Sequence, residues 1–171
     1  VPRRLCVIGG GVIGLEFASI FRSFGSEVTV VEYCKDILPR FDTDLAKRLK
    51  QSLGKKGIEI NTQAQVTSIS ENDGVYSVSF TRKGKEENVI ADKVLMAVGR
   101  KANVDSLNLA DVGIEFTPRG IVVNDVMQTN IPHIYAVGDI NGRMMLAHAA
   151  TFQGIVALDH IMGIENEIDL S

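Results

Sequence analysis

The glycine-rich segment VIGGGVIGLE, residues 7–16, constrains the fold of this chain more than any other feature. It continues a short apolar run of strand length and leads into apolar residues that recur at helical spacing. The pattern Gly9-x-Gly11-x-x-Gly14 in a strand–turn–helix context is typical of a dinucleotide-binding turn. Gly9 permits the tight turn, Gly11 lets a pyrophosphate approach the backbone, and Gly14 lets the helix pack on the strand. The segment therefore predicts a Rossmann-like α/β fold.

A carboxylate at the end of the second expected strand, EVTVVE, supports the same interpretation. Glycines alone are compatible with ordinary turn chemistry, but Glu32 stands where an acid bonds both ribose hydroxyls of an adenosine. A carboxylate there also repels the 2′-phosphate of NADP, and neither Tyr33 nor Cys34 is an arginine that could receive that phosphate. We therefore expect NAD(H) as the cofactor.

The order of the elements predicts a parallel sheet that is interrupted by an antiparallel insertion. A helix from Val12 to about Phe24 and a second helix around residues 42–56 alternate with strands up to residue 61. Short runs separated by NDG and RKGK then predict a β-meander, after which the parallel sheet resumes at KVLMAVG.

A loop-rich stretch separates this unit from the end of the chain, and we expect a boundary between a domain at 1–115 and a segment at 116–171. The segment holds an expected strand at 133–137 and a helix at 146–162 that Gly163 closes. One strand and one helix cannot bury each other into a separate core. We therefore expect residues 121–163 to need a partner, such as a second copy in a homo-oligomer.

Several further positions have two interpretations from the residues alone. Glu16, expected in the first turn of the first helix, either complements the helix dipole or points toward the nicotinamide end of the cofactor. Gly99 is an ordinary turn glycine with a solvated Arg100 beside it, or a point of close backbone approach to a ligand. Asp139 is either a loop acid or an acid that binds a ligand. His148 is either a surface residue or part of the same ligand-binding site as Asp139.

Composition and charge argue against several classes of function. The net charge of −3 argues against nucleic acid as a partner, and no apolar run approaches the roughly 20 residues of a membrane span. Cys6 and Cys34 are isolated thiols rather than a redox pair, and the histidines and acids have no metal-ligand spacing. We expect a cytoplasmic protein without a metal site. Because the sequence has no initial Met, we expect it to be a piece of a longer chain.

Four ordered motifs between Arg4 and Gly163 resemble the pyridine nucleotide-disulfide oxidoreductases, and within them the dihydrolipoamide dehydrogenases. They are VIGGGVIGLEFA, VTVVE, VLMAVGRKANVDSLNL and TNIPHIYAVGDINGRMMLAHAATFQG, of which MLAH is the most telling. The resemblance implies an FAD/NAD(P)-binding fold, with a domain for NAD and part of a second domain for FAD. The chain departs from the family after MLAH, where Ala149, Thr151, Phe152 and Gln153 replace residues that are usually charged.

The resemblance also implies the residues that contact each cofactor. For NAD these are Gly9, Gly10, Gly11, Val12, Ile13, Gly14, Glu16, Glu32, Val66 and Gly99. For FAD they are Asp139, Met145, Leu146, Ala147 and His148. In the family, a dithiol passes electrons through FAD to NAD⁺.

We expect no catalytic residue in this chain, because the CxxxxC redox pair and the His-Glu general base of the family lie in parts that it lacks. The chain alone is therefore expected to be inactive. Two alternatives stay open: a stand-alone NAD(H)-binding module, and a family member of the NADH oxidase or coenzyme A disulfide reductase type.

Overall fold

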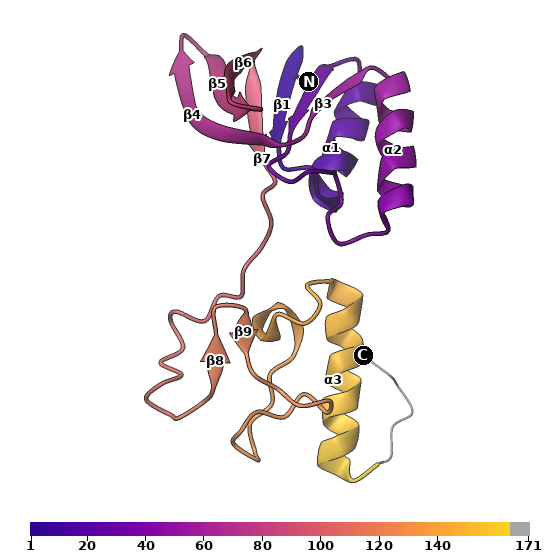
Figure 1. Cartoon of the computed structure of the whole chain (residues 1–171). Helices are drawn as coiled ribbons and strands as arrows, with labels where there is room; N and C mark the ends of the chain where they lie inside the picture. Colours follow the sequence, from indigo (N-terminus) through magenta and orange to yellow (C-terminus); the bar gives the residue numbers. More distant parts are fainter. Residues whose placement is uncertain (165–171) are drawn as a thin grey trace. The chain divides into compact units, whose positions relative to one another are not determined.

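The computed structural model describes residues 1–164, which form two compact units that divide after Gly99. The first unit is built on a parallel sheet in the strand order β3-β2-β1-β7, with its helices together on one side (Figure 1). Its strands are β1 (Arg4–Ile8), β2 (Glu27–Val31), β3 (Ile58–Asn61) and β7 (Lys93–Met96), and its helices are α1 (Val12–Ser23) and α2 (Thr43–Lys55). Every pair of neighbouring strands is parallel, which confirms the predicted α/β fold.

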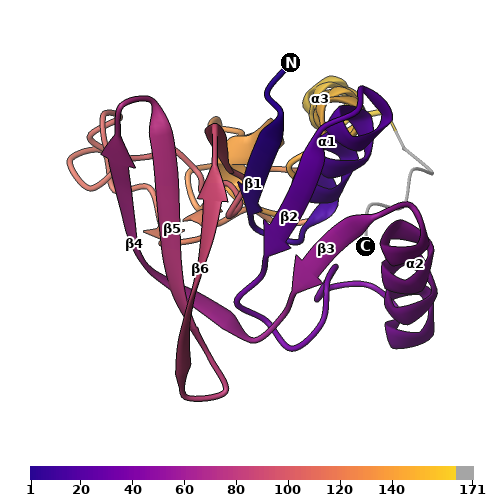
Figure 2. The same ribbon diagram turned by 90° about the horizontal axis from the view of Figure 1, so that it is seen from above.

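The alternation of side chains along β1 explains why this sheet has two covered faces. Leu5 and Val7 belong to a core that includes Leu15 of α1, whereas Cys6 and Ile8 belong to a second core. Successive side chains of a strand point to opposite faces, so a continuously apolar strand is buried on both. Helices cover one face and the antiparallel insertion covers the other (Figure 2).

The insertion is the predicted meander, with strands β4 (Ala64–Asn72), β5 (Val75–Arg82) and β6 (Lys85–Ala91) in that order. Two-residue loops join the strands, and all four of their residues have positive φ: Asp73 (50°), Gly74 (77°), Lys83 (52°) and Gly84 (74°). This is the geometry of type I′ turns, whose twist matches that of the strands. Glycine at the second position of each loop therefore helps to set the register of the meander.

Helix α2 begins at an acidic cap, Asp42. The side chain of Asp42 accepts hydrogen bonds from the amides of Asp44 at 2.9 Å and Leu45 at 3.3 Å. These amides lack partners within the helix, so the carboxylate satisfies donors that water would otherwise hydrate.

Replacing Asp42 with alanine is expected to lower the free energy of unfolding by about 1 kcal/mol, because the cap is lost while the buried face of α2 stays intact. Urea unfolding measures the change. Asp42→Ser, which keeps an oxygen acceptor, serves as the control and should stay close to the original stability. Equal losses in both variants would show that the cap does not stabilise the helix.

The second unit begins at Arg100 and contains little regular structure. Its elements are the two-stranded hairpin β8 (Phe116–Thr117) and β9 (Gly120–Ile121), the 3₁₀ helix η1 (Gly138–Asn141) and the helix α3 (Ala147–Met162). A small core of four buried side chains includes Leu109 and Ile114. Gly163 ends α3 with a φ of 70°, as the sequence predicts.

The prediction of a strand at residues 133–137 is wrong. Tyr135 forms one isolated bridge with Gln128, and two flanking backbone hydrogen bonds run from Thr129 to Ile134 at 2.9 Å and from Ala136 to Met127 at 3.0 Å. The segment thus folds back on its own preceding residues in a short hairpin, which is too short to give a continuous ladder. The apolar residues of this segment contribute Ala136 to the core of the second unit and do not form a strand of a sheet.

The two compact units divide earlier than the boundary that we expected at residue 115. Residues between Arg100 and 115 contribute Leu109 and Ile114 to the core of the second unit, which is why they cluster with it. The last part of the expected segment 116–171 lies outside the described residues. None of the helices in residues 1–164 combines the length and the apolarity of a membrane span.

Candidate cofactor sites

The glycine-rich turn between β1 and α1 is held so tightly that two of its glycines have no room for a side chain. A Cβ on Gly9, whose φ is +114°, would collide with the carbonyl group of Ala97 just after β7. A Cβ on Gly14 would collide with the carbonyl oxygen of Gly9 itself. The amide of Gly9 also donates to Val31 at 2.9 Å. These glycines bring the turn, α1 and the ends of two strands together.

Gly11 is different, because nothing in the protein explains why it is a glycine. Its φ of −77° is accessible to any residue, and a Cβ there would meet no atom within 4 Å. Gly11 is the N-cap of α1, and no side chain within the described residues caps that helix. The first amides of α1 thus have no side-chain acceptor, which is the arrangement that binds a phosphate.

Glu32, directly after β2, makes four hydrogen bonds, which reach the glycine-rich turn, the end of β3 and the start of β4. One carboxylate oxygen accepts from the amide of Gly10, and the other accepts from the amide of Cys34 at 2.6 Å. Its backbone amide donates to Asn61 at 2.8 Å, and its carbonyl accepts from Ala64 at 2.9 Å. The side chain is 7% exposed, so these donors hold a buried carboxylate beside the glycine-rich turn.

The other residues expected to contact NAD lie in the same unit. Val66 is half-buried on β4, opposite Phe80, and packs on the core that includes Ile8 and Val31. Gly99 follows β7 with a φ of +116°. Val12 and Ile13 are exposed at the start of α1. Figure 1 shows the starts of α1 and β4 near one edge of the sheet.

Glu16 corrects one expectation, because it lies in the second turn of α1 and not in the first. Its side chain is exposed, and the first turn of α1 contains no acid. The interaction of an acid with the helix dipole is largest in the first turn. Because Glu16 lies in the second turn, that interaction does not explain why an acid stands here.

The second unit brings together the residues expected to contact FAD around η1 and the start of α3. Asp139 lies in η1 and forms an ion pair with Arg100, with 2.7 Å between Nη2 and Oδ2. Leu146 is the N-cap of α3 and provides no side-chain cap, so the first amides of the helix are open here as well. Met145 is half-buried, whereas Ala147 and His148 are exposed in the first turn.

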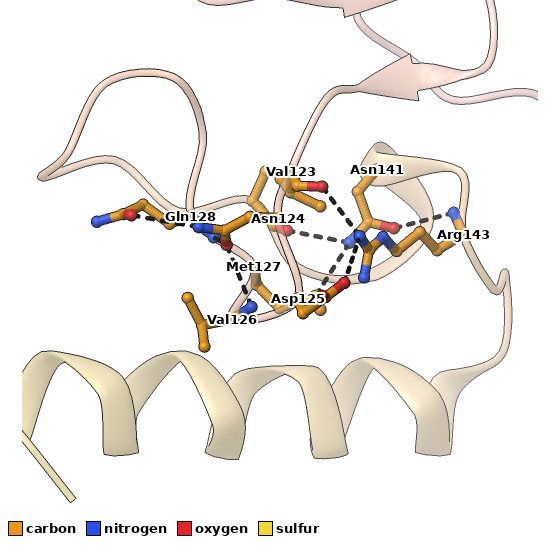
Figure 3. A network of polar contacts seen from close by, with 9 residues as sticks. Val123, Asn124, Asp125, Val126, Met127, Gln128, Asn141 and Arg143 are labelled. Carbon is orange, nitrogen blue, oxygen red and sulfur yellow. Dashed lines mark hydrogen bonds and ion pairs between the residues drawn. The ribbon is translucent and has the colours of Figure 1, made fainter. Parts of the chain in front are cut away.

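A polar network supports η1 from the side of residues 123–128 (Figure 3). The side-chain oxygen of Asn124 accepts from the amides of Val126 at 3.1 Å and Gln128 at 2.9 Å, which closes a tight turn. Arg143 reaches this turn by donating to the carbonyl of Val123 at 3.0 Å and pairing with Asp125 at 3.3 Å. The loop after η1 is thereby tied to the turn.

Both cysteines are free and neither is prepared for thiolate chemistry. Burial raises the pKa of Cys6 to about 11. A hydrogen bond with the Glu32 carboxylate, followed by burial and by the negative charge of that group, raises the pKa of Cys34. Among residues 1–164, no group of three histidine, cysteine or acidic side chains could hold a metal ion.

Two features of these sites are absent from the sequence-based predictions. The ion pair of Arg100 with Asp139 joins positions that are far apart in the chain, and from the sequence Arg100 was considered only as a solvated residue in one of two interpretations. Gln153 is 3% exposed and contacts η1, whereas the sequence marks it only as a departure from the family. Its position on the face of α3 that also holds Ala149, Val156 and Ala157 is the signal that indicates burial.

Comparison with known proteins gives matches over nearly the whole chain. A family model described as pyridine nucleotide-disulphide oxidoreductase matches residues 1–154. A dihydrolipoyl dehydrogenase from Acholeplasma laidlawii is 43% identical over 163 residues, which is 95% of this chain and 47% of the relative. One from Bacillus subtilis is 40% identical over 170 residues, which is 99% of this chain and 36% of the relative.

Solved structures agree with this result. LpdA from Mycobacterium tuberculosis is similar with a TM-score of 0.88 and 32% identity, covering 99% of this chain and 37% of LpdA. The HOCl-induced flavoprotein disulfide reductase RclA from Escherichia coli, as a Cu(II) complex, is similar with a TM-score of 0.82 and 31% identity, covering 95% of this chain and 37% of RclA. The chain thus spans less than half the length of these relatives.

Proposed function

The chain belongs to the pyridine nucleotide-disulphide oxidoreductase family, and from this we propose that its first unit binds NAD(H) at the glycine-rich turn. The observation that carries the proposal is the contrast among the fingerprint glycines. Gly9 and Gly14 are required by the protein's own backbone, whereas a Cβ on Gly11 would meet no atom within 4 Å and the helix that begins there has no side-chain cap. A pyrophosphate group fits at this helix start, because amide donors and a helix dipole favour an anion there.

The remaining parts of NAD(H) have matching residues in the same unit. We propose that Glu32 accepts hydrogen bonds from the adenosine ribose, since each of its oxygens has one amide partner and the Cys34 thiol beside the carboxylate is a weak donor that a hydroxyl can replace. The backbone near Val66 would contact the adenine, and Gly99 and Glu16 would lie toward the nicotinamide. None of these groups transfers a proton; they bind and orient the cofactor.

For the second unit we propose part of a flavin site. Asp139 would bond the ribitol or phosphate portion of FAD, and residues 145–148 would lie beside the flavin ring. When bound, the flavin supplies the electron transfer between a disulfide and the nicotinamide. The open amides at the start of α3 place a positive dipole end where it stabilises negative charge on a reduced ring.

For the complete protein we propose the activity of a dihydrolipoyl dehydrogenase, because the relatives from Acholeplasma laidlawii and Bacillus subtilis, at 43% and 40% identity, carry that name. Electrons would pass from a dithiol through FAD to NAD⁺. The 171 residues contain two isolated cysteines and no CxxxxC pair. We therefore propose that this chain by itself binds NAD(H) and performs no turnover.

We also propose that the second unit is covered by a partner, such as a second copy of the chain, through residues 121–163. The support is an exposed apolar surface on α3. Phe152, Ile155, Leu158, Ile161 and Met162 are between 40% and 68% exposed.

Titration of the chain with NADH and NADPH tests the proposed function. We expect NADH to bind at least about tenfold more tightly, because the buried Glu32 carboxylate repels a 2′-phosphate. Nicotinamide fluorescence gives both affinities. Glu32→Ala should weaken NADH binding and remove the preference, and Glu59→Ala, on the exposed surface of β3, serves as the control. Equal binding of both nucleotides by the unchanged protein would contradict the proposal.

A further inference from the structure

Gln153 connects α3 to both ends of η1 through a single oxygen atom. Its Oε1 accepts from the backbone amide of Gly138 at 2.7 Å and from the side-chain amide of Asn141 at 2.8 Å. Because both partners are donors, the oxygen and not the amide nitrogen of Gln153 must face η1. Because Gln153 is only 3% exposed, loss of this acceptor would leave the Gly138 amide without a partner and would remove one of the acceptors of the Asn141 side chain.

Asn141 extends this contact to the segments on either side of η1. Its amide nitrogen also donates to the carbonyl of Ala136 at 3.0 Å, and its oxygen accepts from the amide of Arg143 at 3.0 Å. The backbone amide of Gly142 donates to Asp139 at 3.2 Å. The entry, the turn and the exit of η1 are therefore all anchored, and Gln153 is the contribution of α3 to that anchor.

Asp139 lies between the two residues that Gln153 holds, Gly138 and Asn141. Its carboxylate faces Arg100, and the open N-terminus of α3 begins at Leu146 on a different element. The connection through residues 142–146 is a loop, so a contact between the elements must fix the separation of the acid from the helix end. The bonds to Gln153 cross directly between η1 and α3.

We propose that Gln153 is a positioning residue that holds Asp139 and the N-terminus of α3 in one fixed arrangement for the flavin. This rests on the proposed function of the second unit. An acid and a helix dipole that act on one ligand must keep their separation when the ligand binds, because a misplacement of about 1 Å loses much of the benefit. Gln153 acts through Gly138 and Asn141 and does not itself contact the ligand.

Hydrogen exchange of individual amides in the 171-residue chain tests the first half of this inference. Gln153→Met has nearly the same length without the acceptor, and we expect the Gly138 amide to exchange about tenfold faster while Ala136 and Thr129 change little. Gln153→Glu keeps the acceptor and should restore the protection of Gly138. Val156→Ala, on the same buried face, should affect all three amides equally, because it removes packing and leaves both bonds.

Comparing amides within each variant makes the result independent of its overall stability. Equal acceleration of Gly138, Ala136 and Thr129 in Gln153→Met would overturn the inference, because it would indicate a general loss of packing. Failure of Gln153→Glu to protect Gly138 relative to Ala136 would overturn it as well. Selective exchange at Gly138, restored by Gln153→Glu, would support it.

Flavin affinity in the complete gene product tests the second half. Gln153→Met should weaken FAD binding about tenfold, with NADH affinity unchanged because the glycine-rich turn is untouched. Unchanged FAD affinity despite a loosened Gly138 would overturn the positioning role and leave the proposed function standing. A complete protein that binds no flavin would overturn the proposed function instead, and with it the purpose that we assign to Gln153.

Discussion

Replacing Gly14 with alanine is expected to lower the free energy of unfolding of the first unit by about 2–3 kcal/mol. Glycine in a helix normally loses about 1 kcal/mol relative to alanine, so this substitution would stabilise an ordinary helical position. At Gly14, however, the new Cβ would collide with the carbonyl oxygen of Gly9, which is backbone and cannot rotate away. The turn would have to shift relative to β1, which is the cost of overpacking a rigid site.

Gly54 offers a matched control for this prediction. It lies in α2, and a Cβ there would meet no atom within 4 Å. Gly54→Ala should therefore raise the free energy of unfolding by about 0.5–1 kcal/mol, the opposite sign for the same chemical change. Urea unfolding followed by circular dichroism measures both variants. Equal changes in the free energy of unfolding at the two positions would show that the close contact between Gly9 and Gly14 does not exclude a side chain at position 14.

The first unit was predictable because its signals are local. The glycine fingerprint, the apolar strands and the cap at Asp42 each specify a turn, a strand or a helix end within a few residues. The meander followed from its loops, since Asp73-Gly74 and Lys83-Gly84 favour a tight antiparallel connection. Order along the chain then allowed few arrangements of a parallel sheet.

The second unit was less predictable because its contacts are not local. The apolar run at 133–137 has the composition of a strand, but a strand exists only where a neighbour offers a ladder of hydrogen bonds. The ion pair between Arg100 and Asp139 and the bonds from Gln153 to η1 join residues that no spacing rule relates. Even in the first unit, the hydrogen bond between Glu32 and Gly10 could not be predicted from the sequence, because only the fold brings the two residues together.

Replacing Gly11 with valine is expected to abolish most NADH binding and to leave stability nearly unchanged. Its φ of −77° and ψ of −178° are extended backbone, which a β-branched residue adopts readily. A Cβ there would meet no protein atom within 4 Å, so we expect a change in unfolding free energy within about 0.5 kcal/mol. The added side chain would instead fill the space through which a pyrophosphate reaches the first amides of α1, and NADH affinity should fall about a hundredfold.

A graded series separates this steric effect from damage to the turn. Gly11→Ala adds a single methyl group and should weaken NADH binding less than Gly11→Val, while Gly54→Ala, in α2, should bind as the unchanged protein does. Fluorescence titration gives the affinities, and urea unfolding of the same samples gives the stabilities. Full NADH binding by Gly11→Val would place the nucleotide elsewhere, because the phosphate and this side chain cannot occupy the same volume. Loss of binding together with a large loss of stability would instead show that Gly11 is required by the fold, as Gly9 and Gly14 are.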